Sequence, residues 1–396
     1  MKILTLKWDC FGYIQIRNAF KRAGFELCEI DFPRDREDTR SSEKLAELVV
    51  HAIQRYNADI VFSFNYFPVV AIAAAACKVK YISWTYDSPY VMLYSRTIEF
   101  PTNYAFVFDK TEYINLKNKG INTVYYLPLA ADTEFYDEIT LDESERIKYA
   151  SDISFIGSMY TEKKNDLIRH FDGLDDYTSG YLSGIMDAQK QIYGMSILEK
   201  SLTPDIVKSI QKVCPMFESG DGVEDASWVL ANYFVARKLT AMERTEMLTA
   251  LSEKYNVAIY TPGKTEYLRK AINRGTVDYY KGFSKAVKAS KININITLRS
   301  IVTGIPLRAF DIMGCGGFLL SNYQADFNDY FIPDEDYVYF DSVDTLVEKA
   351  GYYLEHDVER NKIAKSGYEK VKNYHNYYIR VKEMMDILGI GIQGEH

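Results

Sequence analysis

The spacing of apolar and polar residues along this chain predicts alternating β-strands and α-helices from the first residues onward. In segment 42–57, Leu45, Val49 and Ile53 recur at helical intervals, so they form one apolar stripe on a helix. Short apolar runs bounded by polar residues predict strands. In the first part of the chain these runs are residues 2–7, 26–32, 59–64, 80–85, 104–108 and 123–127. Because helical segments separate them, the pattern indicates a parallel, doubly wound sheet.

A polar stretch at 138–150 has no apolar stripe and predicts a domain boundary. A new strand begins at Asp152, and residues 165–250 are expected to be mostly helical. Later strands are predicted at 257–260, 292–296, 318–321 and 337–340, and the last helices at 343–355, 357–373 and 377–388. The sequence therefore predicts an α/β protein with two Rossmann-like domains, 1–150 and 151–376, whose strand ends face a cleft. Residues 377–396 form a separate final helix.

Segment 290–317 predicts a ligand site in the second domain. Its strand alternates isoleucine with Asn293, Asn295 and Thr297, so one face carries amides and a hydroxyl. Strands covered on both faces usually read as continuous apolar runs. A buried amide without a partner costs about 1–3 kcal/mol. These side chains therefore need either protein partners or a ligand.

Two arginines, a carboxylate and a glycine-rich turn follow in the same segment. The guanidinium groups of Arg299 and Arg308 match the geometry of phosphate oxygens. Asp311 has the chemistry to accept hydrogen bonds from ribose hydroxyls, and Gly314 begins a turn tight enough to join helix to strand. The alternative for either arginine is a salt bridge on the surface or between domains. Together these groups predict a pocket for a phosphorylated, hydroxyl-bearing ligand.

Two other strand ends carry candidate groups. The strand from residue 152 ends in Gly157 and Ser158, and a turn of this kind leaves backbone N–H groups free to meet a phosphate. The strand at 80–85 runs into Tyr86 and Asp87. A carboxylate there suits a general base or an acceptor of sugar-hydroxyl hydrogen bonds. The alternative is that Asp87 caps the next helix or turn.

Composition and charge narrow the class of protein. The chain is 47% hydrophobic and 26% charged, which is typical of a soluble globular protein. Its net charge of −8 argues against general attraction to nucleic acid or anionic lipid. Five cysteines without CxxC spacing indicate reduced thiols in a cytoplasm rather than disulfides or a structural zinc site. The longest apolar run, near 67–77, is too short to cross a bilayer.

Several enzyme classes lose support because their motifs are absent. The first strand–helix junction lacks the GxGxxG spacing of dinucleotide binders, and the chain has no HExxH, P-loop or nucleophile elbow. Asp334 and Asp336 form a D-x-D sequence of the kind that holds a metal on a nucleotide sugar. We expect a solvated acidic turn there, and no metal site.

The chain resembles the bacterial spore-maturation glycosyltransferases of the CgeB-like group, which have the GT-B fold. The resemblance extends over nearly the whole length. The first half resembles that group's companion domain and the second half its group 1 transferase domain. The matching segments are Ile82–Pro89, Leu127–Ala130, Ser154–Ser158, Ser290–Thr297, Gly304–Gly314, Glu359–Ala364 and Gly367–Val371.

This resemblance implies a nucleotide-diphosphate sugar held mainly by the second domain, and a glycan or protein acceptor held mainly by the first. It implies no cofactor beyond that substrate and no bound metal, and it implies that the final helix crosses back onto the first domain. Many related enzymes carry a pair of glutamates, the second of which binds the ribose; Asp311 lies at that position, but Thr303 replaces the first. Tyr86 lies where related enzymes have a histidine facing the sugar, which leaves Asp87 as the general base if the reaction inverts. The incomplete pair leaves the stereochemical outcome open.

Two other functions remain open from the sequence. A nucleotide-sugar epimerase shares the two-domain fold but requires no acceptor. The alternative without enzymatic activity is a sugar- or nucleotide-binding module that acts in surface or spore-coat assembly. The donor sugar, the base, the acceptor and the oligomeric state are not specified by the sequence.

Overall fold

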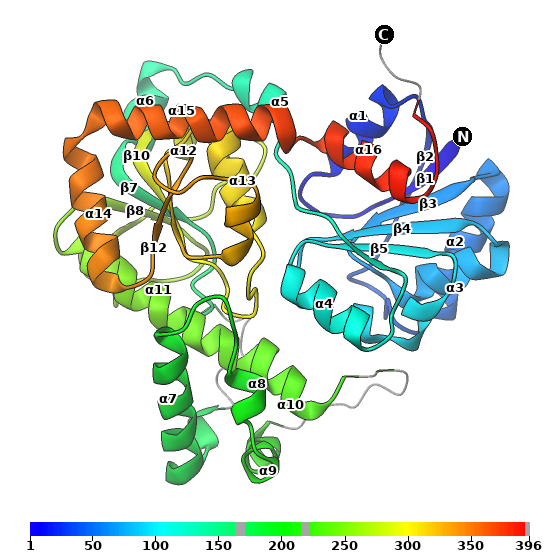
Figure 1. Cartoon of the computed structure of the whole chain (residues 1–396), viewed down its shortest axis with the longest axis horizontal. Coiled ribbons are helices and arrows are strands. Elements are labelled where there is room, and N and C mark those ends of the chain that lie inside the picture. Colours follow the sequence, from blue (N-terminus) through cyan, green and yellow to red (C-terminus); the bar gives the residue numbers. More distant parts are fainter. Residues whose placement is uncertain (163–170, 215–221, 223, 393–396) are drawn as a thin grey trace. The chain divides into compact units, whose positions relative to one another are not determined.

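The computed structural model describes residues 1–162, 171–214, 222 and 224–392, which form two compact units (Figure 1). Of the described residues, unit 1 comprises 1–131, 222, 224 and 374–392, and unit 2 comprises 132–162, 171–214 and 225–373. The division therefore follows Ala131, whereas the sequence pattern predicted it near residue 150.

The segment before residue 150 belongs to unit 2 because its side chains bind there. It forms α5 (Thr133–Asp137) and α6 (Glu143–Tyr149), and a capping box between Asp142 and Glu145 begins α6. Glu145 pairs with Lys285, and the Tyr136 hydroxyl donates a hydrogen bond to Asp311. The polar composition that suggested a linker thus belongs to a short surface helix.

Unit 1 contains a parallel sheet in the order β2-β1-β3-β4-β5-β6. Its strands are β1 (Lys2–Lys7), β2 (Glu26–Asp31), β3 (Ile60–Phe64), β4 (Lys80–Thr85), β5 (Asn103–Val107) and β6 (Val124–Tyr126). Its helices are α1 (Tyr13–Arg22), α2 (Glu43–Tyr56), α3 (Pro68–Cys77), α4 (Lys110–Asn118) and α16 (Tyr377–Ile387), with 3-10 turns at Val91–Tyr94 and Arg96–Glu99. These elements agree with the strands predicted from the apolar runs.

Helix α2 shows how local sequence sets these bounds. The Ser42 hydroxyl accepts a hydrogen bond from the Leu45 N–H and caps the first turn. Leu45, Val49 and Ile53 are buried on one face, as their spacing predicted. The helix ends at Asn57, which has the left-handed φ of 52° that asparagine tolerates.

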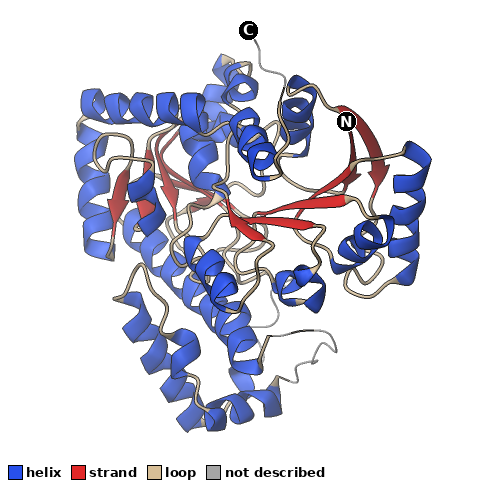
Figure 2. Cartoon of the chain, turned by 45° about the vertical axis from the view of Figure 1, so that its right-hand side comes forward, coloured by secondary structure: helices blue, strands red, loops and turns tan. Residues whose placement is uncertain are grey.

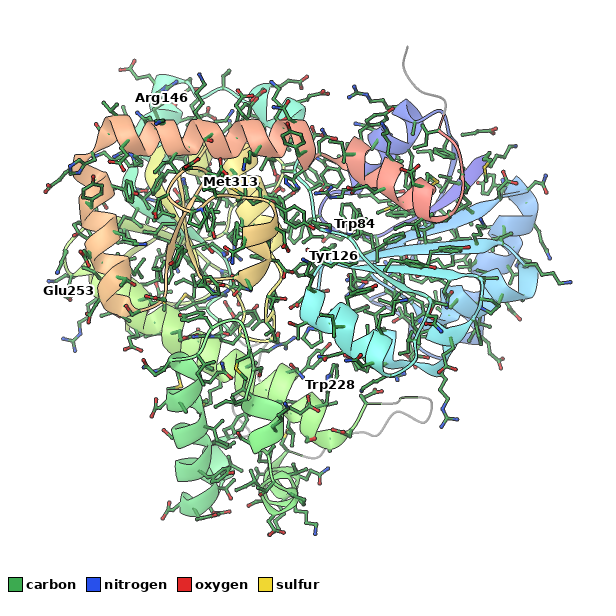
Figure 3. The ribbon with its side chains drawn as sticks, viewed as in Figure 1. Trp84, Tyr126, Arg146, Trp228, Glu253 and Met313 are labelled. Carbon is green, nitrogen blue, oxygen red and sulfur yellow. The ribbon has the colours of Figure 1, made fainter. Side chains whose placement is uncertain are left out.

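Helix α16 is part of unit 1 although it lies at the other end of the chain. It packs against α1, and Gly12 leaves room for the Tyr377 ring, since a Cβ at Gly12 would lie 2.4 Å from the Tyr377 hydroxyl oxygen. Trp84, which Figure 3 labels, belongs to β4. Its ring meets the Tyr377 ring edge-on, with 5.8 Å between the ring centres. Arg380 donates to the carbonyl of Pro128, which fixes the helix to the end of the sheet.

Unit 2 contains the second parallel sheet, in the order β12-β11-β10-β7-β8-β9. Its strands are β7 (Ser151–Ile156), β8 (Val257–Tyr260), β9 (Ile272–Asn273), β10 (Ser290–Asn295), β11 (Leu319–Asn322) and β12 (Val338–Phe340). Strand β9 has two residues and was not predicted, because so short a run has no periodicity. Helices cover the strands (Figure 2).

The remaining helices of unit 2 fall into two groups. Those around the sheet are α11 (Ala236–Ser252), α12 (Phe283–Lys288), α13 (Leu307–Gly314), α14 (Val343–Glu355) and α15 (Asp357–Tyr374), with a 3-10 turn at Ala325–Asp329. Those of a helical arm are α7 (Asp176–Lys190), α8 (Leu198–Ser201), α9 (Pro204–Val213) and α10 (Ala226–Val229). A π-helical turn at Leu230–Val235 joins α10 to α11. The arm has its own apolar core and lies to one side of the sheet (Figure 1).

The prediction of a mostly helical segment at 165–250 is confirmed for 171–214 and 224–250. Residues 165–170, 215–221 and 223 lie outside the described part of the chain. All five cysteines are free thiols, and Cys10, Cys214 and Cys315 are buried.

Candidate functional site

Strands β7 and β10 are neighbours at the centre of the unit 2 sheet, so their carboxyl ends bring the predicted donor groups together. Asn295 ends β10, Gly157 follows β7, and α13 begins nearby after Pro306. Arg308 and Asp311 are one turn apart on α13. These residues are separated in sequence and meet at one edge of the sheet.

Arg308 has no carboxylate partner among the described residues. Its Nη1 donates a 3.2 Å hydrogen bond to Asn295 Oδ1, and the guanidinium lies 5.6 Å from the centre of the Phe155 ring. Gly157 makes this position possible, because a Cβ there would lie 2.6 Å from Arg308 Nη2. Burial and the neighbouring positive charge of Arg244 lower the pKa of Arg308 to about 10. An anion bound beside Arg308 would relieve that repulsion.

Arg244, on α11, is a second arginine that the sequence did not single out. Its Nε donates to the carbonyl of Ile296 at 3.1 Å, and its Nη1 donates to the carbonyl of Ser158. The guanidinium also lies 4.8 Å from the centre of the Tyr160 ring. Arg244 is 2% exposed and forms no ion pair with a described carboxylate. It therefore adds buried positive charge and joins the ends of β7 and β10.

Asp311 is buried, and two tyrosines hold one of its oxygens. Oδ1 accepts hydrogen bonds from the hydroxyls of Tyr136 at 2.8 Å and Tyr279 at 3.1 Å. Burial raises the pKa of Asp311 to about 7, while the two tyrosines and Arg308 act in the opposite direction. The carboxyl group therefore titrates near neutral pH, and Oδ2 has no hydrogen bond from a described residue.

The expectation that the Gly157–Ser158 turn leaves its N–H groups free is wrong for three of its amides. The Gly157 N–H donates to the Tyr260 carbonyl, the Met159 N–H to Glu162, and the Tyr160 N–H to the Ser158 hydroxyl. The Ser158 hydroxyl in turn donates to Glu162 at 2.7 Å. In this turn Gly157 makes space for Arg308, and its amide is occupied by the sheet.

Arg299 is used within the protein. It forms a bidentate ion pair with Glu243, at 2.8 Å to Oε2 and 2.6 Å to Oε1. It also donates to the carbonyls of Ile192 and Lys190, and its guanidinium lies 3.9 Å from the centre of the Tyr193 ring. These contacts tie the loop after β10 to α11 and to the helical arm. The salt-bridge alternative considered for an arginine describes Arg299.

The polar row of β10 also finds protein partners. Asn293 accepts a 2.7 Å hydrogen bond from the Ser154 hydroxyl and donates to the Val287 carbonyl. Asn295 donates to the hydroxyls of Thr297 and Ser321, and its remaining oxygen accepts from Arg308. Asn293 therefore acts within the sheet, whereas Asn295 orients Arg308.

The turn after α13 is rich in glycine because neighbouring side chains leave no room for a Cβ at Gly317. Gly314 is the last residue of α13 and is buried. A Cβ at Gly317 would lie 2.4 Å from Val287 Cγ1 and 2.8 Å from Asn293 Nδ2. The turn thus lets α13 and β11 approach β10 closely.

In unit 1, Asp87 and Tyr86 follow β4 and are positioned by Asn65. The buried Asn65 has a φ of 57°, donates to Asp87 Oδ2 at 2.8 Å and accepts from the Tyr86 N–H at 3.2 Å. Asp87 is exposed and Tyr86 is half-buried. Burial and the negative charge of Asp87 raise the pKa of the Tyr86 phenol, so it stays protonated. The rings of Trp8 and Phe11 each lie 6.3 Å from Tyr86.

A buried carboxyl group lies close to this turn. Glu112, on α4, accepts hydrogen bonds from the Ser88 hydroxyl and the Tyr90 N–H, each at 2.9 Å. Burial raises the pKa of Glu112 to about 8, and the charge of Asp109 acts in the same direction. Glu112 is therefore protonated at neutral pH. Its two hydrogen bonds hold the segment from Ser88 to Tyr90, directly after Asp87, against α4.

The D-x-D turn is solvated at Asp334 and Glu335, as expected, but Asp336 is buried. Asp336 is 2% exposed, accepts from the Ile332 N–H and the Ser366 hydroxyl, and pairs with Lys370 at 2.8 Å. It therefore holds a loop to α15. Among the described residues there is no group of three or more histidine, cysteine or acidic side chains arranged to hold a metal ion. No helix in the described ranges is long and apolar enough to span a membrane.

Comparison with known proteins agrees with this architecture. A profile of the family described as "Glycosyl transferase-like" matches residues 240–386, which include Arg244, Arg308 and Asp311. No match was found among proteins with curated descriptions.

Solved structures with low sequence identity cover almost the whole chain. A glycosyltransferase from Rickettsia africae is 13% identical, with a TM-score of 0.51 over 98% of this chain and 97% of that one. Sucrose-phosphate synthase from Thermosynechococcus elongatus is 11% identical, with a TM-score of 0.53 over 98% of both chains. HepE of Anabaena, solved with UDP-glucose, is 9% identical, with a TM-score of 0.54 over 98% of this chain and 99% of that one. These likenesses, with the two parallel six-stranded sheets, show that the chain has the GT-B fold of glycosyltransferases.

Proposed function

We propose that this protein is a glycosyltransferase that moves a sugar from a nucleotide-diphosphate sugar to an acceptor hydroxyl. The observation that carries the proposal is the pair Arg244 and Arg308: two neighbouring arginines at the carboxyl edge of the unit 2 sheet, neither with a carboxylate partner among the described residues. The glycosyl transferase-like profile covers both. The motifs of the first half further support assignment to the CgeB-like group.

In this proposal the donor diphosphate lies against Arg308. Charge develops on the diphosphate as the bond to the sugar breaks, and a fixed guanidinium in a partly buried site stabilises that charge. Asn295 and Gly157 keep Arg308 in place. Asp311 accepts hydrogen bonds from ribose hydroxyls through Oδ2. The reaction then needs no metal ion, and unchanged activity in excess EDTA is the expected result.

The acceptor side of the proposal rests on Asp87. An exposed carboxylate held by the buried Asn65 is positioned to accept a proton from an attacking hydroxyl. The aromatic rings of Trp8, Phe11 and Tyr86 lie beside it, and Phe11 is 49% exposed. Apolar ring faces next to a carboxylate suit a sugar, so we propose a glycan acceptor.

The test begins with the purified protein and a panel of nucleotide sugars, with released nucleotide measured with and without candidate glycans. Arg308→Ala should lower kcat/KM by about 10- to 150-fold, since a charge-assisted hydrogen bond contributes about 1.5–3 kcal/mol. Arg237→Ala is the matched control: Arg237 is on the same helix as Arg244, its guanidinium lies 5.2 Å from the centre of the Tyr233 ring, and it forms no ion pair with a carboxylate that the structure describes. A folded Arg308→Ala protein with normal turnover would remove the basis of the proposal.

Asp87→Asn tests the acceptor side separately. Turnover should fall while the affinity for nucleotide stays unchanged, because Asp87 is assigned to the proton and not to the donor. If turnover and nucleotide affinity fell together, Asp87 would have a structural role instead.

A further inference from the structure

Tyr160, in the turn after β7, has a backbone conformation that tyrosine rarely adopts. Its φ is 57°, in the left-handed region, where a Cβ is crowded by the backbone. The other non-glycine residues with a left-handed φ in the described ranges have simple reasons for it. Two asparagines and an aspartate have short polar side chains that tolerate this region, and Lys78 ends helix α3. Neither reason applies to Tyr160.

The turn holds Tyr160 in this conformation through hydrogen bonds of Ser158. The Tyr160 N–H donates to the Ser158 hydroxyl at 2.9 Å, and the Ser158 carbonyl accepts from Arg244 Nη1. Backbone strain of this kind persists only where surrounding contacts fix it, and it concentrates at binding and catalytic sites. The conformation of the turn therefore points to a role for the Tyr160 side chain.

The Tyr160 side chain lies beside the two arginines of the candidate site. Its half-buried ring has its centre 4.8 Å from the Arg244 guanidinium and stacks on no other described ring. Burial lowers the pKa of both Arg244 and Arg308, and Tyr160 acts in the opposite direction on each. Since the hydroxyl is the polar group of this side chain, it lies near both guanidinium groups.

The proton of the Tyr160 hydroxyl has no acceptor in the described part of the chain. Arginine side chains only donate hydrogen bonds, so neither Arg244 nor Arg308 takes this proton. An anion bound beside the two guanidinium groups supplies the missing acceptor, because phosphate oxygens accept hydrogen bonds from arginine and from hydroxyl groups alike.

We propose that Tyr160 is a donor-binding residue: its hydroxyl donates a hydrogen bond to the diphosphate that Arg308 binds, and the left-handed turn places it there. Gly157 and Tyr160 then serve the same site from one turn, since Gly157 leaves room for Arg308 and Tyr160 adds a neutral donor. The inference rests on the proposed glycosyl transfer for one point only, which is that the anion belongs to a nucleotide sugar.

Inorganic pyrophosphate is the probe, because it carries the diphosphate without a base or a sugar. Isothermal titration calorimetry of the full chain at one fixed salt concentration should show binding by the parent protein. Tyr160→Phe should weaken that binding by about 10- to 150-fold, the range for a hydrogen bond to a charged group. Its stability in urea should stay unchanged, since phenylalanine keeps the ring over Arg244. A side chain that only packs on Arg244 would not separate affinity from stability in this way.

Two further variants test whether the turn is strained in solution. Tyr160→Gly and Tyr160→Ala both remove the ring and the hydroxyl, so both should lose pyrophosphate affinity at least as far as Tyr160→Phe. Only alanine is disfavoured at a left-handed φ, so the unfolding equilibrium constant of Tyr160→Ala should exceed that of Tyr160→Gly by at least about fivefold. Lys78→Gly and Lys78→Ala are the matched control, because Lys78 also has a φ of 57° but lies in unit 1. They should show the same order of stability and the pyrophosphate affinity of the parent.

Three results would overturn the inference. The first is parental pyrophosphate affinity in Tyr160→Phe, which would mean that the ring only packs on Arg244. The second is a parent protein that does not bind pyrophosphate. The third is equal stability of Tyr160→Ala and Tyr160→Gly, which would show that the turn is not held in the left-handed region.

The failure of this inference and the failure of the proposed function give different results. Pyrophosphate binding that depends on the Tyr160 hydroxyl, without transfer from any nucleotide sugar, would leave the assignment of Tyr160 standing and remove the glycosyltransferase proposal. Sugar transfer by Tyr160→Phe with the kcat/KM of the parent would do the reverse.

Discussion

Replacing Gly157 with alanine tests whether the position of Arg308 determines nucleotide binding. An alanine Cβ would lie 2.6 Å from Arg308 Nη2 and 3.0 Å from its Cζ. Ordinary contact begins at 3.4 Å, so the guanidinium must move by about 0.8 Å. A shift of about 1 Å in a binding group is enough to cost up to 100-fold in rate. We expect Gly157→Ala to weaken binding of the donor's nucleoside diphosphate by about 10- to 100-fold.

Folding should respond differently from binding. The displaced group is the far end of a flexible side chain, and Gly157 does not have a left-handed φ. Alanine also reduces the conformational entropy of the unfolded chain, which stabilises by about 0.4–1 kcal/mol where the site accepts it. Urea unfolding should therefore show a free energy of unfolding equal to or above that of the parent protein.

Isothermal titration calorimetry at one fixed salt concentration measures the binding change. Gly180→Ala, in α7, is the control: nothing lies within 4 Å of its added Cβ, so the variant should gain up to about 1 kcal/mol of stability and bind nucleotide normally. A folded Gly157→Ala protein with parental nucleotide affinity would refute the assignment of Arg308 to the diphosphate.

Three further predictions concern buried ionisable groups. Nucleotide affinity should fall as the pH drops through about 7, because Asp311 becomes protonated, and an affinity that does not depend on pH would contradict this. Tyr136→Phe should raise the pH of half-maximal affinity, since the tyrosine hydrogen bond lowers the pKa of Asp311. Glu112 binds its proton more tightly in the folded protein than in the unfolded chain, so the free energy of unfolding should fall as the pH rises from about 4.5 to about 8. Urea unfolding across that range should show a smaller fall in this free energy for Glu112→Gln than for the parent protein. Arg299→Met should destabilise the protein by about 3–5 kcal/mol because it leaves Glu243 buried without its partner, while Arg299→Met/Glu243→Leu should lose less; equal losses would show that the pair is not coupled.

Most strands and helices were predictable because their signals are local. The apolar runs predict β1 to β6, and the apolar stripe at helical spacing predicts α2. The alternation of strands with helices then predicts parallel sheets, and both sheets are parallel. Strand β9 was missed because it has two residues. The unit boundary was misplaced because a polar segment reads equally well as a linker or as the short surface helix α6.

The site was only partly predictable because its roles depend on contacts between distant residues. The sequence does not distinguish the roles of Arg299 and Arg308. In the structure Arg299 forms an ion pair with Glu243, whereas Arg308 donates a hydrogen bond to Asn295. Arg244 was not singled out, since a lone arginine in a helix has no local signal. The function of Gly157 as space for a side chain also required the structure, because only the fold places Arg308 beside it.

The polar row of β10 has a consequence for how unit 2 reaches its fold. Side chains alternate between the faces of a strand, so a slip of one residue would exchange the isoleucines with Asn293 and Asn295. The amides would then face the apolar core without Ser154 and Ser321, at about 1–3 kcal/mol for each unsatisfied group. An all-apolar central strand would tolerate such a slip far better. The asparagines thus select one register for the central strand, and with it the alignment of the strand ends that bring Arg308 and Gly157 together.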